Sequence, residues 1–490
     1  MVEEMSGTWF GLEIARRGLQ VHQNTLNITG HNLANASTPG YSRQEAVLNA
    51  TAPYTTPSLG CPAPPGQLGT GVEISSIRRI RDEYLDHQVR RAVTDTAYWE
   101  DQISVFQRAE ASFAEPASSG IGDRIVDFFK AWQDLNNSPQ DPGVKASVVQ
   151  IGDELASLMS YTYNQLTDVQ NSVAMIVETK GQDDAPNTYE LAGGQLQEQV
   201  AEANSLLVQI RDLTVAIEKI YISGQQPNDL LDQRDLLLEE LSKFGPLTVK
   251  IDTDKGKPTG GLELDLFGID VMADDTTLEL TIKTIGADSD ARETICLSVG
   301  DTEVNLTDNC NDTDKGGSLL GLERARQSLA MFKDHLNDLA TSMRDAILAV
   351  NKEPPEAEPS EFFVDDLVAG TFRVEDGLLS NPALLDGTKA KDISSLRGKN
   401  IDEDEKRFTF EEYYSLLLTK VGGSAKSAAD IAGNQSAISK QITALRDSVS
   451  GVLIDEELTK MLQFQYGYQA SARVVNVMDS MLDTLINRLF

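Results

Sequence analysis

Apolar residues recur at helical spacing near the beginning of the chain. Within residues 9–34 one apolar set repeats every seven residues, and a second set does the same on another face of the helix. The two sets are Leu12, Leu19, Leu26 and Leu33, and Ile14, Val21 and Ile28. A helix that lies on one core carries a single apolar stripe, so two stripes predict a helix that is covered from two sides.

The residues after this helix have the chemistry of a turn and then of an extended segment. Asn35 is a tolerable helix stop, and Pro39 cannot continue a helix. A Pro39-Gly40 pair at the two central positions predicts a turn, with type II geometry as the natural choice. Prolines are then dense between residues 51 and 71, so residues 51–75 are expected to form an extended, semi-rigid linker.

The C-terminal segment is a second helix with two apolar faces. Its main stripe alternates steps of three and four residues: Met461, Phe464, Tyr468, Ser471, Val475, Met478, Leu482, Leu485 and Leu489. A second stripe contains Leu462, Tyr466, Val474, Val477 and Met481. We expect the two terminal helices to pack as a coiled coil and to leave an apolar face for another subunit, because a monomer rarely exposes so large a patch. The pattern alone leaves open the alternative that one helical bundle buries both faces.

The middle of the chain changes its periodicity twice. Helical spacing dominates residues 76–245 and 316–450, which indicates a helical bundle. Residues 246–315 alternate with period two between Gly, Asp and Pro breaks, which predicts a small antiparallel β domain. Residues 352–410 are mixed, with short strand candidates among Pro- and Glu-rich segments. The fold class is therefore mainly α with a smaller β domain.

One charged residue occupies a position expected to be buried. The apolar seam of the helix at 230–244 reads Leu230, Arg234, Leu237, Leu241 and Phe244. An unpaired guanidinium would be costly there, so we expect Arg234 to reach a carboxylate or the carbonyls at the end of a neighbouring helix. Together with the adjacent Asp232 and Asp235, it is predicted to form a structural clamp.

Composition and charge narrow the class of protein. The 490 residues contain 42 Lys and Arg against 76 Asp and Glu, a formal charge of −34. This length predicts two or more domains, and this charge disfavours nucleic acid and anionic lipid as partners. No segment has the ~20 apolar residues that span a bilayer, and the acidic beginning of the chain lacks the apolar region of a cleaved secretory signal. The acids are concentrated in the middle, whereas both ends carry few charges.

Motifs that carry chemistry are missing from the sequence. The four histidines are isolated, the three cysteines are far apart, and no nucleophile elbow or phosphate loop is present. Residues 252–256 and 308–314 resemble calcium loops only faintly, since neither has the full set of ligand positions. We therefore expect no catalytic residue, no cofactor and no metal.

Three segments resemble one known family. Residues 30–44, GHNLANASTPGYSRQ, resemble the N-terminal signature of bacterial flagellar axial proteins, and residues 456–487 resemble their C-terminal signature. Both signatures are shared with hook and rod proteins. Residues 226–235, QPNDLLDQRD, are similar to an internal motif of the flagellar hook-associated protein 1 family, the first hook–filament junction protein.

The resemblance implies an elongated, layered architecture. The implied domains are an inner coiled-coil axial domain (1–50 and 451–490), the Pro-rich linker (51–75), a helical bundle (76–245 and 316–450, with 352–410 as a mixed, partly β insertion) and an outer β domain (246–315). The residues expected to serve axial packing and polymerisation are Leu12, Leu19, Leu26, Asn32, Asn35, Pro39, Gly40, Tyr41, Met461, Phe464, Tyr468, Val475, Met478, Leu482 and Leu485.

The resemblance also implies a function and a set of partners. Members are exported unfolded through the flagellar secretion channel without a cleaved signal peptide, and they polymerise at the distal end of the hook to join hook and filament. Their partners are further copies of the chain, the hook protein, the second junction protein and an export chaperone that binds the C-terminal region. Two alternatives are another axial subunit of hook or rod and, from a different class, a secreted coiled-coil adhesin or enzyme.

Overall fold

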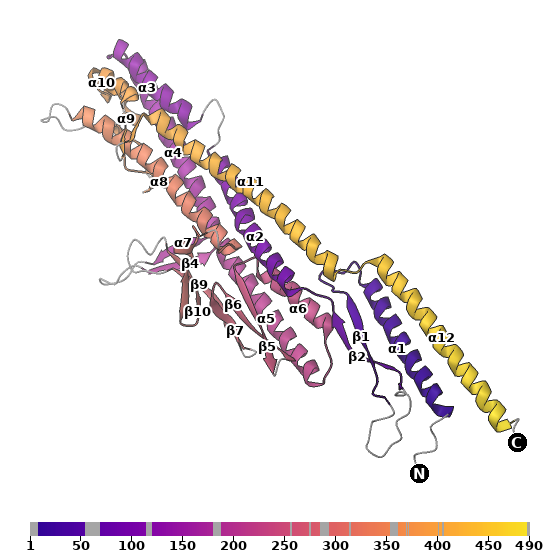
Figure 1. Ribbon diagram of the computed structural model, residues 1–490. Coiled ribbons are helices and arrows are strands. Elements are labelled where there is room, and N and C mark those ends of the chain that lie inside the picture. The colour runs from indigo at the N-terminus through magenta and orange to yellow at the C-terminus, as the bar shows by residue number, and fades with distance from the viewer. Residues whose placement is uncertain are drawn as a thin grey trace.

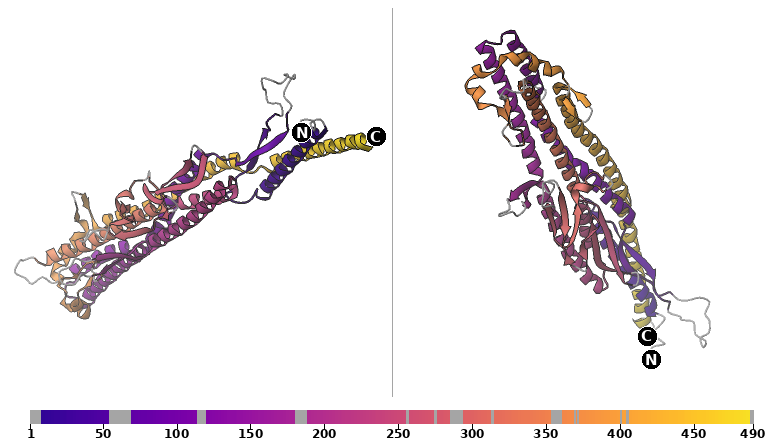
Figure 2. Two further views of the ribbon diagram at one scale, coloured as in Figure 1. Left: turned by 90° about the horizontal axis from the view of Figure 1, so that it is seen from below. Right: turned by 90° about the vertical axis from the view of Figure 1, so that its left-hand side faces the viewer.

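The computed structural model shows an elongated molecule. The residues that it describes are 8–53, 69–113, 120–179, 188–254, 257–273, 276–284, 294–312, 315–352, 361–368, 370, 372–399, 401–403 and 406–487. A helical bundle occupies most of the length, and the two terminal helices form a separate pair at one end of the molecule (Figure 1). Two further views show the same long shape and the same position of the pair (Figure 2). The elongated, mainly α architecture expected from the sequence is confirmed.

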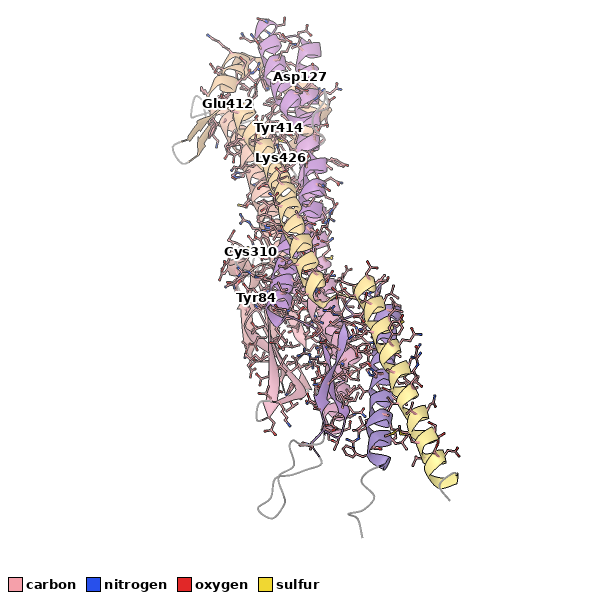
Figure 3. All side chains as sticks on the ribbon, turned by 45° about the vertical axis from the view of Figure 1, so that its right-hand side comes forward. Tyr84, Asp127, Cys310, Glu412, Tyr414 and Lys426 are labelled. Carbon is pink, nitrogen blue, oxygen red and sulfur yellow. The ribbon has the colours of Figure 1, made fainter. Side chains whose placement is uncertain are left out.

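Long helices form the bundle, and several of them begin at a capping side chain. The Asp82 carboxylate accepts hydrogen bonds from the Tyr84 and Leu85 amides, and Thr409 and Glu412 form a capping box. The helices are α2 (Glu83–Ser112), α3 (Ile121–Asn137), α4 (Pro142–Val173), α5 (Gln195–Ile222), α6 (Asn228–Leu241), α8 (Ser318–Asn351) and α11 (Phe410–Ser450). In Figure 3, Glu412 marks the end of the bundle far from the terminal pair, and side chains fill the space between the helices.

Aromatic side chains form the centre of the bundle core at this far end. The Phe128 ring is fully buried, and its centroid lies 5.4 to 6.3 Å from the rings of Phe129, Trp132, Phe362 and Phe363. Phe362 and Phe363 come from the mixed segment between α8 and α11, so this insertion completes the bundle core instead of forming a unit of its own.

Short elements make up the rest of this insertion. They are β12 (Phe363–Val364), β13 (Arg373–Val374), α9 (Asp376–Ser380), η2 (Pro382–Leu384), η3 (Gly387–Lys389), α10 (Ala390–Ser395), η4 (Leu396–Gly398), β14 (Ile401–Glu403) and β15 (Lys406–Phe408).

The β region lies along one side of the bundle. One antiparallel sheet has the order β5-β6-β7-β8 and a second has the order β11-β10-β9, as the period-two pattern predicts. The Asn204 side chain on α5 exchanges two hydrogen bonds of 2.8 Å with the backbone of Leu280 on β9, so the second sheet is fixed to α5. The elements are β5 (Leu247–Asp254), β6 (Lys257–Leu266), β7 (Ile269–Ala273), β8 (Thr276–Thr277), β9 (Leu280–Thr284), β10 (Ile295–Val299), β11 (Thr302–Asn305) and α7 (Leu306–Asn309).

Two hairpins differ from the sequence predictions. Strand β1 (Gln44–Ala50) pairs with β2 (Val72–Arg79), so residues 72–75 belong to a strand and not to the expected linker. Pairing with β1 satisfies the backbone of β2, a long-range interaction that the local composition does not reveal. The Pro-rich residues 54–68 lie outside the described part of the chain. A second hairpin, β3 (Met175–Thr179) with β4 (Thr188–Gly193), lies within residues 76–245, where helical spacing alone predicted a bundle.

Candidate functional site: the terminal helix pair and its joint

Helices α1 (Thr8–Ala34) and α12 (Ile454–Asn487) pack side by side in antiparallel directions (Figure 1). A Cβ added to Gly18 would lie 3.0 Å from the Ser471 hydroxyl oxygen, and one added to Gly467 would lie 2.5 Å from the His22 ring. Larger side chains would therefore disturb the seam. The coiled coil expected from the two stripes is present, and glycine permits the close approach of its helices.

Small and polar residues predominate among the buried side chains of α1. The buried residues of α1 are Ala15, Val21, Thr25, Thr29 and Asn32. Gly11, Gly18, Thr25 and Asn32 recur every seven residues, directly before the leucines of the predicted stripe. This heptad of small and polar residues was the signal that the sequence prediction missed, because it considered only large apolar residues.

The predicted packing residues of the pair lie beside this seam. Leu12, Leu19, Leu26, Met461, Phe464, Val475, Met478 and Leu482 are half-buried. Tyr468 is 39% exposed, and the Leu485 side chain lies outside the described part of α12. Two helices alone cannot enclose these side chains, so the pair is incompletely covered in the single chain.

A second face of α12 remains exposed. Its apolar residues are Ile454, Leu458, Leu462, Tyr466, Val474, Val477 and Met481. Leu462 is 53% exposed and Met481 is 56% exposed. We call these seven residues the α12 stripe. The alternative in which one bundle buries both faces of the terminal helix is therefore wrong for this chain.

Asn32 is the centre of a buried polar cluster at the base of the pair. Its side-chain amide donates to Glu457 Oε2 at 3.0 Å and to the Gln44 carbonyl at 2.9 Å. Its Oδ1 accepts from the Tyr41 hydroxyl at 2.9 Å and from the Gln44 amide at 3.0 Å. Asn32 is 1% exposed, so this complete set of hydrogen bonds is what makes its burial tolerable. Burial and the charge of nearby Asp229 raise the pKa of Tyr41 above its usual value, so its hydroxyl stays a donor.

The turn after α1 has the geometry that its Pro-Gly pair predicts. The Tyr41 amide donates to the Thr38 carbonyl at 3.2 Å, and Gly40 has φ of +75°. Pro39 and Gly40 are exposed, and the Asn35 amide donates to the His31 carbonyl at 3.1 Å. A Cβ on Gly40 would contact Leu236 at 3.4 Å, so this turn lies directly against α6.

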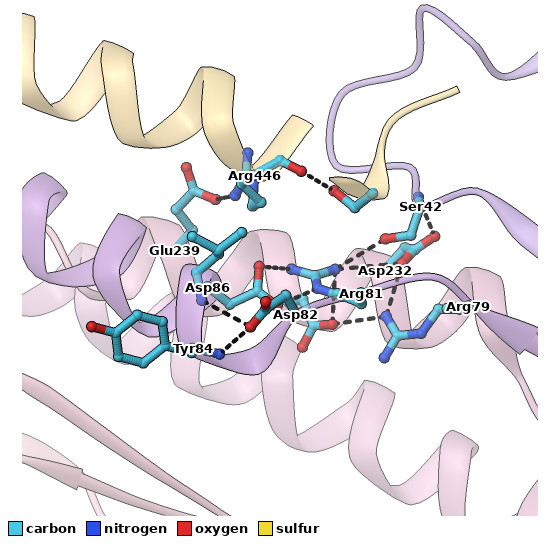
Figure 4. A network of polar contacts seen from close by, with 12 residues as sticks. Ser42, Arg79, Arg81, Asp82, Tyr84, Asp86, Asp232, Glu239 and Arg446 are labelled. Carbon is cyan, nitrogen blue, oxygen red and sulfur yellow. Dashed lines mark hydrogen bonds and ion pairs between the residues drawn. The ribbon is translucent and has the colours of Figure 1, made fainter. Parts of the chain in front are cut away.

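Two aspartates of α6 hold the segment around β2 in place (Figure 4). Arg79 donates to Asp232 and to Asp235 at 2.8 Å each, and Arg81 lies 3.0 Å from Asp235. The Ser42 amide donates to Asp232 at 2.9 Å. Burial by itself raises the pKa of Asp235, but Arg81 and Arg79 outweigh burial and hold the pKa below its usual value. The carboxylates predicted beside Arg234 thus contact two arginines that the sequence reading did not select.

The same carboxylates do not hydrogen-bond to Arg234. Arg234 is 3% exposed, and its Nη1 donates to the Gly260 carbonyl on β6 at 2.7 Å. The expected partner, a carboxylate or carbonyl of a neighbouring helix, was wrong because the surface next to α6 at this point is a strand. Arg234 therefore connects α6 to the β region, while Asp232 and Asp235 connect α6 to the terminal segments.

Further contacts tie α11 and α12 to the same place. The Arg43 guanidinium lies 2.8 Å from Glu456, and its amide donates to the Ser450 carbonyl at 2.8 Å. Arg446 lies 2.6 Å from Glu239 of α6. These contacts flank residues 451–453, where α11 ends and α12 begins. The terminal pair is thus joined to the bundle by polar contacts. We call this region the polar joint, and its residues are Ser42, Arg43, Arg79, Arg81, Asp232, Asp235, Glu239, Arg446 and Glu456.

The described residues contain neither a candidate metal site nor a helix that could span a membrane. No group of three or more His, Cys, Asp or Glu side chains there is placed to hold a metal ion. In the same part of the chain, every helix is too short or too polar to cross a membrane.

Comparisons with known families define first a class and then a family. Residues 12–41 match the family described as flagella basal body rod protein, and residues 446–489 match the C-terminal family of the flagellar basal body rod FlgEFG proteins. These two segments contain most of the terminal pair and define the class of flagellar axial proteins. Residues 106–183 and 181–354, together about half of the chain, match the flagellar hook-associated protein FlgK helical domain. The chain belongs to the FlgK family, whose members are structural proteins of the flagellar hook–filament junction.

Individual relatives match this chain over nearly its full length. The flagellar hook-associated protein 1 of Bacillus subtilis (strain 168) is 27% identical over 99% of both chains. The protein of the same name from Salmonella typhimurium is 22% identical over 96% of this chain and 98% of the relative. The solved structure of the flagellar hook junction protein FlgK from Burkholderia pseudomallei has a TM-score of 0.57, with 15% identity, and covers 74% of this chain and all of that one. At 15% identity, this structural match supports the fold alone.

Proposed function

We propose that this chain polymerises at the distal end of the hook and joins hook to filament. The observation that carries the proposal is the α12 stripe, which one chain leaves exposed beside a terminal pair that is only half-buried. A neighbouring copy that covers the stripe would remove this apolar surface from water. Contact between unlike faces of successive copies propagates, as a tubular array requires.

The proposed partners follow from this position in the flagellum. Further copies, the hook protein and the second hook–filament junction protein would contact the chain in the assembled axis. Before export, a chaperone would bind the C-terminal region and cover the apolar faces of α12 by a helix-in-groove contact. Export through the flagellar channel requires no cleaved signal peptide, and the role is structural and not catalytic.

Deletion of residues 456–490 tests the proposal. The expected result is a strain whose hooks carry no band of this protein and no attached filament, seen by electron microscopy of labelled flagella. The residual chain keeps the aromatic core of the bundle, and its circular dichroism and cooperative unfolding should show that it is folded. Normal filaments on hooks in this strain would contradict the proposal.

A further inference from the structure

A cavity of about 520 Å³ lies between α2, α6 and the β5–β6 ribbon. Arg90 on α2 and Arg234 on α6 line it from two helices, and Gly260 lines it from β6. Val249 and Leu262 provide part of an apolar wall. The cavity adjoins the polar joint but faces the β region, so it is distinct from the surface assigned to assembly above.

The charge of the cavity is opposite to that of the chain. Five arginines line it against three carboxylates, whereas the whole chain has 42 basic and 76 acidic residues. Three of these arginines are neutralised. Arg78 lies 3.4 Å from Glu45, Arg79 donates to the aspartates of α6, and Arg81 donates to Asp86 at 2.6 Å. Two guanidinium groups therefore remain without a paired carboxylate.

Arg90 and Arg234 are these two groups. Among the described residues, the Arg90 side chain makes no hydrogen bond or ion pair, and Arg234 makes one hydrogen bond, to the Gly260 carbonyl. The Nε atoms of both are buried without a partner. Burial lowers the pKa of both groups, which means that the surrounding protein does not fully stabilise their charged forms. Asp86 and Asp235, whose charges act on Arg90, already bond to other arginines.

We propose that this cavity binds an oxyanion, a carboxylate or phosphate group, through the free N–H groups of Arg90 and Arg234. Guanidinium groups hold carboxylate and phosphate oxygens with directed, charge-assisted hydrogen bonds. An apolar wall strengthens such bonds by excluding water. The oxyanion is either a dissolved ion or an Asp or Glu side chain of a second copy of this acidic chain.

Isothermal titration of the full-length chain with inorganic phosphate at low ionic strength tests the first source. Removal of one guanidinium in Arg90→Gln is expected to weaken phosphate binding by about tenfold or more, because charge-assisted bonds are lost. Arg90→Lys keeps the charge without the fork of donors and should bind with intermediate affinity. Arg211→Gln is the control, since Arg211 pairs with Asp212 on the surface of α5 and should leave the affinity unchanged.

Sedimentation velocity of the same variants at low and high salt tests the second source. If a second copy supplies the carboxylate, the wild-type chain self-associates at low salt, Arg90→Gln abolishes this association, and Arg211→Gln retains it. Circular dichroism verifies that each variant is folded. The proposal is overturned if phosphate binds to the wild type and to Arg90→Gln with the same measurable affinity. It is also overturned if the wild type shows neither phosphate binding nor self-association that depends on Arg90. Neither outcome bears on the α12 stripe, so this site and the assembly function fail separately.

Discussion

The bundle and the terminal pair differ in how completely they bury their large apolar side chains. In the bundle, large aromatic side chains such as Phe128 and Trp132 are enclosed from all directions by several helices. In the pair, large apolar side chains remain half-buried or exposed, and the most deeply buried positions of α1 are small or polar. A several-helix bundle can complete a core within one chain, whereas a two-helix pair needs neighbours. Stability is therefore concentrated in the bundle, and we propose that the capacity for assembly is concentrated in the pair.

Truncation of the aromatic core should have the largest effect on the stability of the isolated chain. Phe128→Ala removes a fully buried ring that four other rings contact, and it should lower the free energy of unfolding of the bundle by about 3–5 kcal/mol. Urea unfolding followed by circular dichroism measures this loss. Tyr161→Ala on the exposed side of α4 should change it by less than about 0.5 kcal/mol. If Phe128→Ala and Tyr161→Ala lowered the free energy of unfolding equally, the aromatic core would not be the main source of stability.

A smaller and local effect is expected at the base of the pair. Asn32→Ala leaves Glu457 with one hydrogen bond fewer and removes the Asn32 oxygen that accepts from the Tyr41 hydroxyl, a local cost of about 1–3 kcal/mol. Hydrogen exchange should become faster in α1 and α12 and stay unchanged in α4, because local opening does not require the bundle to unfold. Asn27→Ala, at an exposed position of α1, is the matched control. Unchanged exchange in α1 and α12 would show that the cluster does not hold the pair.

The polar joint should weaken in acid. The pKa of Asp235 in the folded chain lies below its usual value, so protonation is harder in the folded state than in the unfolded state. Its contribution is complete above the unfolded pKa of about 3.9 and is lost as pH falls through the lower folded value. Hydrogen exchange of β1 and β2 between about pH 5 and pH 2, corrected for intrinsic rates, measures this loss. Asp235→Asn should reduce the pH dependence, and Asp212→Asn on the surface of α5 should not.

The smallest effect on the isolated chain is expected at the α12 stripe. The triple change Leu462→Gln, Val474→Gln and Met481→Gln should alter unfolding by less than about 0.5 kcal/mol per site, because these side chains are already exposed. The same change should strongly reduce incorporation at the hook, seen by microscopy of labelled flagella. Serine at the exposed polar positions Gln465, Gln469 and Asn476 provides a matched control that should assemble normally. A triple variant that assembles like the wild type would remove the stripe from the assembly surface.

Local patterns in the sequence predicted much of the fold. The 3,4 spacing of apolar residues predicted the terminal helices, and period-two alternation predicted the antiparallel strands between residues 246 and 315. Pro39-Gly40 predicted the turn, because the constraints on its φ angles are properties of those two residues. Each of these features depends on neighbours within a few positions, which a single sequence displays directly.

The tertiary structure alone decided which partners meet. Arg79 contacts Asp232, and Asn32 contacts Glu457, residues that are far apart along the chain. The sequence does not show which arginine pairs with a given carboxylate. The placement of β2 against α6 pairs Arg79 and Arg81 with Asp235, whereas Arg234 donates to a carbonyl of strand β6. Likewise, periodicity predicted two apolar faces on each terminal helix, but it did not predict which face packs against the other terminal helix. The glycines and polar residues of α1 decide which face packs, because the distance between two packed helices depends on the smallest side chains between them.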